Sequence, residues 1–307
     1  MRGAMMRSWI RRLMFLVAFV FAFAVLGVGV LYWYYHPKYE RIDGVIYGHR
    51  NGQALTMDVF KPQVPNGRAV AFMASGRWKS KRPGIAEARM FAPLLRSGYT
   101  IFAVCHVSQP ESKIPEIIED VTRGIRFIRY HAGEYGIDPN RIGVTGGSAG
   151  GHLCLMLATR GGESHPNPRD EIDRESGAVQ AVAIFYPVTD FLNMQGSTED
   201  SGGKGPPLSF VDAFEVEATE PQKWKDIGYR ASPIYFVTDK LPPILIYHGD
   251  ADTLVPLDQS ERFRDRARSV GREVKIVVHR GGGHGWRTMY FDSRTFARWF
   301  DEHLLGR

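Results

Sequence analysis

A serine set among small residues is the first feature of this chain that could do chemistry. Ser148 lies in the run Gly-Gly-Ser-Ala-Gly-Gly of residues 146–151. Residues 141–145 before it predict a short strand, and the apolar residues 152–159 after it predict a helix. A serine hydroxyl is a weak nucleophile and needs exposure, an adjacent base and donors for an oxyanion. A sharp turn would expose it; the alternative is that Ser148 only caps the helix.

Two later segments carry the residue types that would activate such a serine. Residues 244–248 predict a strand that runs into a loop with two carboxylates, Asp250 and Asp252. A second predicted strand, 274–278, leads to His284, which has glycine on both sides. A histidine can accept the serine proton while a carboxylate orients its ring. The chain order serine, acid, histidine is typical of α/β-hydrolases rather than of other serine hydrolases.

Three motifs together resemble the esterase/lipase branch of the α/β-hydrolase superfamily, near hormone-sensitive-lipase-like and acetyl-esterase-like carboxylesterases. They are Gly-Gly-Ser-Ala-Gly-Gly, His-Gly-Asp-Ala-Asp-x-x-Val-Pro and Gly-Gly-Gly-His-Gly-Trp, at residues 146–151, 248–256 and 281–286. The resemblance runs from about residue 47 to the C-terminus. It implies that Ser148 is the nucleophile, His284 the general base and then the general acid, and Asp252 the residue that orients His284.

The acid and the histidines have alternative interpretations. The family acid is the last residue of His-Gly-x-x-Asp, which is Asp252, but Asp250 also lies beyond the end of the strand. The other role expected for Asp250 is to cap a turn by accepting from the amide of residue 252 or 253. For the other nine histidines we expect solvated surface positions.

The loop expected to form the oxyanion hole departs from these relatives. The family has His-Gly-Gly-Gly-Trp after the strand at 69–73, whereas this chain has Ala-Ser-Gly-Arg-Trp at residues 74–78. Backbone amides donate whatever their side chain, so the resemblance still implies donors at Ser75, Gly76 and Ala149, with the amide of Arg77 as a further alternative in the loop. The change leaves open which amide of the loop points inward.

Two side chains of the same loop are candidates for substrate contact. Trp78 aligns with the family tryptophan, and Arg77 stands where the family has a third glycine. An arginine at this position would be able to reach a bound substrate. An exposed arginine with no role is the equal alternative.

The rest of the chain alternates strands and helices, which predicts a mostly parallel sheet with helices on both faces. The expected strands are 42–47, 55–60, 69–73, 100–107, 141–145, 179–186, 244–248 and 274–278. The expected helices are 86–96, 114–131, 152–159, 257–270 and 290–305. The interpretation is an α/β-hydrolase fold in one catalytic domain, 36–307. Within it, about 190–232 is either a lid insertion or a flexible loop.

Residues 1–35 are predicted to be a membrane anchor. No charge occurs in residues 13–35, and a helix over 13–31 would span about 28 Å. The run ends in Leu-Tyr-Trp-Tyr-Tyr, typical of an interfacial aromatic belt, so we expect an uncleaved signal anchor rather than a cleaved signal. Four arginines precede the span, which places the N-terminus in the cytoplasm and the catalytic domain outside. The alternative is secretion after cleavage.

Charge and composition exclude several other functions. The net charge is +6, and four of those charges are the arginines at positions 2, 7, 11 and 12, so a nucleic-acid groove is not expected. No metal-ligand cluster and no dinucleotide or phosphate loop is found, so no cofactor is expected. The two cysteines, Cys105 and Cys154, fit buried core positions, and their pairing is left open.

The predicted function is hydrolysis of carboxylic esters through an acyl-enzyme on Ser148. By resemblance the acyl group is short, of the acetyl type, on a small-molecule or carbohydrate alcohol, and the lipid bilayer is the other expected partner. A peptidase of the prolyl-oligopeptidase type is an alternative, but its large gating domain is missing. A non-catalytic binding module with this fold is the second alternative. Nothing in the sequence indicates an oligomeric state.

Overall fold

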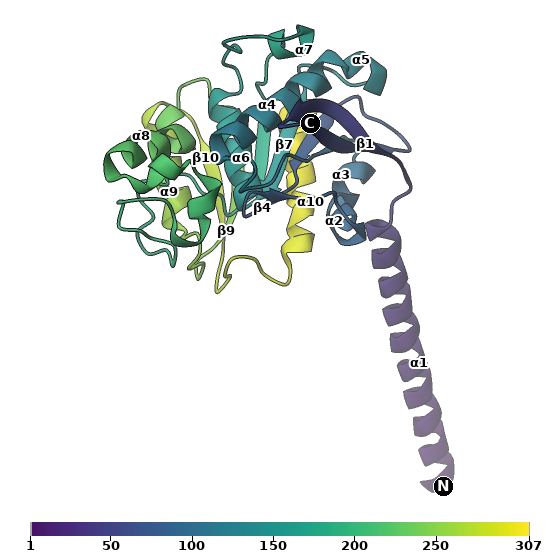
Figure 1. Ribbon diagram of the computed structural model, residues 1–307. Coiled ribbons are helices and arrows are strands. Elements are labelled where there is room, and N and C mark those ends of the chain that lie inside the picture. Colours follow the sequence, from purple (N-terminus) through teal and green to yellow (C-terminus); the bar gives the residue numbers. More distant parts are fainter. Residues whose placement is uncertain (1, 307) are drawn as a thin grey trace.

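A computed structural model describes residues 2–306, and an eight-stranded sheet lies at its centre (Figure 1). The strand order is β1-β2-β6-β3-β7-β8-β9-β10. The strands are β1 (Tyr39–Arg50), β2 (Gln53–Pro62), β3 (Ala69–Met73), β6 (Thr100–Val104), β7 (Ile142–Gly147), β8 (Ala181–Phe185), β9 (Ile244–Gly249) and β10 (Val274–His279). Strand β2 is antiparallel to both of its neighbours, and all other pairs are parallel. This is the α/β-hydrolase fold.

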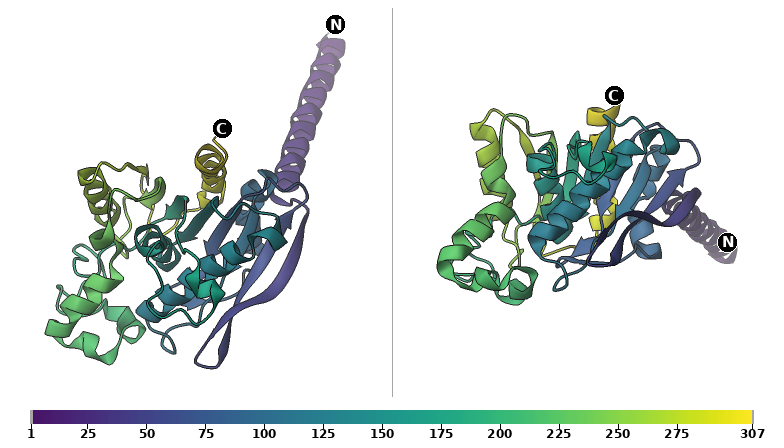
Figure 2. Two further views of the ribbon diagram at one scale, coloured as in Figure 1. Left: turned by 90° about the horizontal axis from the view of Figure 1, so that it is seen from above. Right: turned by 45° about the horizontal axis from the view of Figure 1, so that its top comes forward.

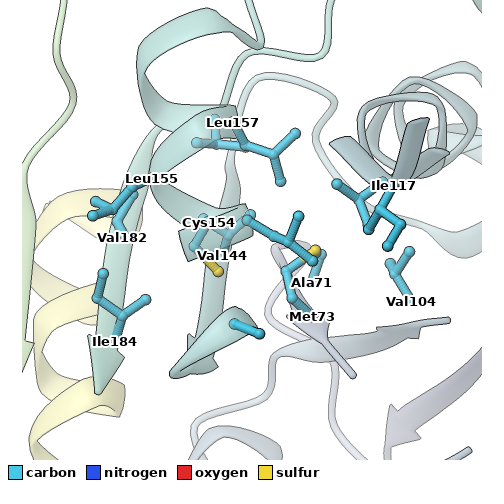
Figure 3. Packing of buried hydrophobic residues seen from close by; sticks show 14 of the residues in the cluster. Ala71, Met73, Val104, Ile117, Val144, Cys154, Leu155, Leu157, Val182 and Ile184 are labelled. Atoms are coloured by element: carbon cyan, nitrogen blue, oxygen red, sulfur yellow. The ribbon is translucent and has the colours of Figure 1, made fainter. Parts of the chain in front are cut away.

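Helices cover both faces of the sheet because successive strand residues point to opposite sides. In β9, Ile244 and Ile246 pack with α4 (Ile114–Tyr130), α6 (Ala149–Arg160) and α9 (Asp258–Ser269). Leu245 and Tyr247 pack on the opposite face with α3 (Ala92–Arg96) and α10 (Met289–Phe300). Figure 3 shows part of the first cluster and Figure 2 shows the layers from two further directions. The α/β architecture predicted from the alternating pattern is therefore confirmed.

Most predicted elements occur, but several limits were wrong. The helix expected over 86–96 is two short helices, α2 (Ile85–Met90) and α3, because Pro93 lies in the first turn of the second helix, where no N–H is needed. The strand expected to reach residue 107 ends at Val104, the last residue paired with both β2 and β3. The C-terminal helix ends at Phe300 and continues as a π-helical turn, Asp301–Leu305.

The segment 190–232 is more regular than its polar sequence indicated. It contains the 3₁₀ turns Leu208–Ala213 and Val216–Thr219 and the helix α8 (Pro221–Ala231), followed by a third 3₁₀ turn, Pro233–Phe236. Its aromatic residues Phe210, Phe214 and Trp224 are buried. The segment therefore packs on the domain beside the carboxyl edge of the sheet.

Four further short elements complete the described chain. They are β4 (Ser75–Gly76), β5 (Lys79–Ser80), α5 (Ala132–Tyr135) and α7 (Glu171–Arg174). Both cysteines are buried as predicted, and both are free.

The N-terminal helix α1 (Arg2–Tyr35) runs away from the domain (Figure 1). An 18-residue window within its segment Arg12–Tyr35 has a mean hydropathy of 2.8, and none of that window is buried. By length and composition it could cross a membrane, and a signal sequence has the same properties. Its last turn rests on the domain: Arg96 Nε of α3 donates to Tyr34 O at 2.7 Å, and Arg294 Nε of α10 donates to Tyr35 Oη at 3.1 Å.

Candidate active site

The turn between β7 and α6 holds Ser148 in a strained backbone conformation. Its φ is 54° and its ψ is −119°, a region that non-glycine residues rarely adopt. The turn can close this tightly only because its neighbours lack side chains. A Cβ on Gly150 would lie 2.6 Å from Met73 O, and one on Gly146 would lie 2.8 Å from the carbonyl carbon of Gly150. The Ser148 amide donates to Phe185 O of β8 at 3.0 Å, which ties the turn to the sheet.

Three side chains from distant parts of the chain meet at this edge of the sheet. The distance between His284 Nε2 and Ser148 Oγ is 2.9 Å, and that between His284 Nδ1 and Asp252 Oδ2 is 2.8 Å. Ser148 follows β7, Asp252 follows β9 and His284 follows β10, and parallel strands bring these three loops to one edge. The arrangement can move a proton from the hydroxyl to the imidazole while the carboxylate holds the ring.

Asp252 is held ionised although its side chain is buried. Burial raises its pKa, but hydrogen bonds from His248, from His284 and from the amide of Val255 together outweigh it. The net effect is a pKa well below the ordinary value. The amides of Leu254 and Val255 donate to Oδ1 at 3.0 and 2.9 Å, which leaves Oδ2 directed at His284. A carboxylate fixed in this way stabilises a neighbouring imidazolium.

Asp250 does not contact His284 in the structure. Its Oδ1 instead accepts from the amide of Gly281 at 2.6 Å. The prediction that it would bond the amide of residue 252 or 253 was wrong, because the loop after β10 folds back over the end of β9. Asp250 therefore braces the loop that carries His284.

The loop after β3 runs alongside Ser148 with an unusual backbone. Arg77 and Trp78 both have positive φ, 56° and 55°, so two non-glycine residues occupy the left-handed region in succession. Gly76 and Arg77 line the same cavity as Ser148, whereas Ser75 lines a neighbouring one and places its Oγ 2.9 Å from His106 Nε2. Ala149 begins α6, so its amide is one of the unpaired donors at a helix N-terminus.

The two side chains predicted to meet substrate differ in exposure. Trp78 is buried, and its indole packs against Phe191 and Phe210 with ring centroids 5.5 and 5.3 Å apart. Arg77 is exposed, and its guanidinium lies 5.1 Å from the centre of the Phe210 ring. Both residues line the cavity of about 400 Å³ that contains Ser148 and His284.

His152 is a structural contact that the sequence interpretation missed. It is fully buried, Trp78 Nε1 donates to its Nδ1 at 3.2 Å, and its Nε2 lies 2.7 Å from Ala231 O. Because Nδ1 accepts, Nε2 carries the proton and donates to Ala231. Burial lowers the pKa of His152 to about 4, so the ring is neutral near pH 7. The ring links the loop after β3 to the end of α8.

The prediction that all nine other histidines are solvated was wrong. His106, His152 and His248 are buried, each with both ring nitrogens near polar atoms. His152 could have been found from its place in the apolar helix predicted over 152–159, because a helix that is apolar on all sides is buried. Among residues 2–306, no group of three or more side chains could hold a metal ion.

The chain is similar to several ester hydrolases. The BD-FAE family model matches residues 57–266. A probable carboxylic ester hydrolase, LipM, of Mycobacterium tuberculosis is 29% identical over 77% of this chain. A probable isoprenylcysteine alpha-carbonyl methylesterase, ICMEL1, of Arabidopsis thaliana is 25% identical over 97%. These matches span 54% and 64% of the two relatives' lengths.

Solved structures include a similar fold over nearly the whole domain. A truncated form of a carbohydrate esterase from gut microbiota has a TM-score of 0.74 and 26% identity. The match covers 88% of this chain and 99% of that one.

Proposed function

The chain belongs to the BD-FAE family, and we propose that it is a serine hydrolase that cleaves carboxylic esters through an acyl-enzyme on Ser148. The observation that carries the proposal is the continuous contact from Asp252 through His284 to Ser148, at 2.8 and 2.9 Å. This geometry supports an enzyme over a binding module that retained the fold, because a binding module has no need of an aligned proton acceptor.

In the proposed reaction, Ser148 Oγ attacks the ester carbonyl and its proton passes to His284 Nε2. The tetrahedral oxyanion accepts hydrogen bonds from the amide of Ala149 and from an amide of the loop after β3. Gly76 and Arg77 are the candidates in that loop, because both line the cavity that contains Ser148. As the carbon–oxygen bond to the alcohol breaks, His284 returns the proton to the leaving oxygen. Water activated by His284 then attacks the acyl-enzyme and releases the acid and free Ser148.

The proposed substrate is a short-acyl ester of the acetyl type. The cavity at Ser148 is closed on one side by Trp78 and roofed by residues of the segment 190–232, including Phe191, Met194 and Phe210. A roof of packed aromatic rings suits a small acyl group. The likeness to a carbohydrate esterase supports a sugar as one class of alcohol.

We further propose that α1 is an uncleaved anchor, with residues 1–35 forming the membrane segment and residues 36–307 the catalytic domain. The basic residues before the span support a cytoplasmic N-terminus and a catalytic domain on the other side. The test is membrane fractionation followed by protease treatment of intact cells or spheroplasts. A shortened, soluble protein found outside the cytoplasm would show that the segment is a cleaved signal and not an anchor.

The enzymatic proposal is tested by labelling with a fluorophosphonate and by a panel of matched esters and amides. We expect the wild-type protein to be labelled and Ser148→Ala not to be labelled. We also expect ester cleavage to exceed amide cleavage for the same acyl group. A protein that binds the esters but neither reacts nor is labelled would be a binding module, and preferential amide cleavage would indicate a peptidase.

A further inference from the structure

A second cavity lies on the other side of the loop after β3. Its volume is about 440 Å³, and it shares Gly76, Gly147 and Tyr186 with the cavity that contains Ser148. Two of these three wall residues have no side chain, and a Cβ on Gly147 would still lie 3.5 Å from Tyr186. The two cavities are therefore separated near the nucleophile by little more than backbone and one tyrosine ring.

The lining of the second cavity is largely hydrocarbon. Its walls come from β3, α2, α3, β8 and α10, and its main apolar side chains are Phe72, Met90, Phe91, Leu94, Met289 and Phe296. Phe91, Leu94 and Phe296 are buried to 2% exposure, so the walls are packed and preformed. Lys79 lies at its exposed rim. A pocket of this size and character accommodates an apolar chain.

Two of the helices that line this cavity, α3 and α10, also contact the end of α1. Arg96 of α3 bonds the last turn of α1, and Tyr35 packs on Phe291 of α10 with ring centroids 5.9 Å apart. Phe291 and its neighbour Tyr290 are 46% and 41% exposed, although both are large rings. Figure 1 shows α1 leaving the domain beside α2 and α3. If α1 crosses a bilayer, its aromatic last turn lies at the interface, and the start of α10 lies at the same level.

We propose that this second cavity binds the alkyl chain of a bilayer-borne alcohol whose short-acyl ester is the substrate. The inference rests on the proposed esterase function and names an alcohol class in addition to the sugar proposed above: a membrane amphiphile. The small acyl group lies under the roof formed by Phe191 and Phe210, and the alcohol chain passes over Gly147 into the cavity between α3 and α10. Cleavage follows the route given above, and the released alcohol returns to the bilayer.

The first test uses full-length protein reconstituted in phosphatidylcholine vesicles with acetates of linear alcohols. Each methylene transferred from water into the cavity contributes about threefold to fourfold. Referred to the free aqueous concentration of each acetate, kcat/KM should therefore rise at least about a hundredfold from ethyl to octyl acetate. Met90→Trp and Leu94→Trp, which fill the cavity, should each lower the ratio of octyl acetate to ethyl acetate hydrolysis by at least about tenfold. Arg89→Trp is the matched control, because it adds the same indole to an exposed position of α2.

Several outcomes of this test would overturn the inference. A flat series of acetates would do so, and so would a rise that survives both filling variants. If kcat/KM instead rises with acyl-chain length in ethyl esters of linear acids, the cavity binds the acyl chain and not the alcohol chain.

The second test reads binding without turnover. Hexadecanol with a photoreactive diazirine near its chain end is placed in the same vesicles with Ser148→Ala protein, and adducts are mapped by mass spectrometry. We expect adducts on α2, α3 or the start of α10, and their loss in Met90→Trp/Ser148→Ala. Adducts confined to α1 would overturn the inference whatever the activity. Absence of esterase activity with adducts still in the cavity would instead count against the proposed function alone.

Discussion

Two loops border the candidate nucleophile, and they reach unusual backbone conformations by opposite means. The turn of residues 146–151 is built mainly from glycines, because a Cβ at Gly146 would lie 2.8 Å from the backbone of Gly150 and a Cβ at Gly150 would lie 2.6 Å from Met73 O. The loop of residues 74–78 has Arg77 and Trp78 at positive φ, where the resembling family has glycine at the first of these positions. The conformation of the turn depends on the absence of side chains, whereas the conformation of the loop depends on contacts with other parts of the chain.

The contacts that hold the loop come from far away in the chain. Trp78 donates to His152 on α6, packs on Phe191 and Phe210, and its carbonyl accepts from the amide of Gln109 at 3.0 Å. Left-handed backbone costs a non-glycine residue about 1–2 kcal/mol, so two such residues in succession require compensating contacts. Arg77 therefore keeps a left-handed backbone although the family has glycine at this position.

The largest expected effect concerns Ser148, which lies in the glycine turn, and its partners His284 and Asp252. Ser148→Ala and His284→Ala should each lower kcat for a short-chain activated ester by about four to six orders of magnitude, because the residues act as a unit. The double variant should lose little more. Steady-state kinetics on the detergent-solubilised protein measures this. Strictly additive losses would show that the residues do not act as a unit.

Asp252→Asn should lower kcat strongly and Asp250→Asn only mildly. The reverse order would assign the role of the acid to Asp250.

The steric requirement of the turn is tested by Gly150→Ala against Gly147→Ala. The new Cβ at Gly150 would overlap Met73 O, whereas the one at Gly147 would make ordinary contact at 3.5 Å with Tyr186. We expect Gly150→Ala to lose folding stability by about 2–4 kcal/mol and most activity, and Gly147→Ala to change stability by less than about 1 kcal/mol. Thermal unfolding and fluorophosphonate labelling measure both. Equal stability of the two variants would show that the turn relaxes more easily than the distances imply.

The tether of the loop is tested at His152. His152→Phe removes the acceptor for Trp78 Nε1 and leaves a buried N–H without a partner, which costs about 1–3 kcal/mol. We expect kcat to fall about tenfold to a hundredfold with little change in KM, because the loop amides lose their position relative to the oxyanion. His152→Gln, which can accept and donate again, should recover part of kcat. A fall in stability with unchanged kcat would limit His152 to a role in folding.

The smallest expected effect concerns Arg77. Arg77→Gly relieves backbone strain but increases the entropy of the unfolded chain and loses the contact with Phe210, so stability should change by less than about 1 kcal/mol. Arg77→Val should be less stable than Arg77→Ala, because a β-branched residue tolerates positive φ poorly. Thermal unfolding gives the ranking. If Arg77→Gly keeps stability but raises KM for a given ester, the side chain contacts that substrate.

Elements whose determining interactions are local could be predicted from the sequence, and those that depend on distant contacts could not. The strands and the chain order of Ser148, Asp252 and His284 were predictable because hydrophobic periodicity and short motifs are local signals. The break between α2 and α3 had a visible cause in Pro93, but the pattern of apolar residues runs through it and predicted one helix. The packing of the segment 190–232 was not predictable, because its aromatic residues find their partners on other elements.

The sequence by itself determined the order of strands and helices, the glycine turn around Ser148 and the apolar helix α1, since each follows from residue types within one short window. Only the tertiary structure decided that Asp252 rather than Asp250 faces His284, because the loop after β10 folds back and occupies Asp250 with the amide of Gly281. It also decided that His152 is buried against Trp78, and that α3 and α10 hold both an apolar cavity and the end of α1. Such contacts join residues tens to hundreds of positions apart, and their distances are set by the packing of the whole sheet.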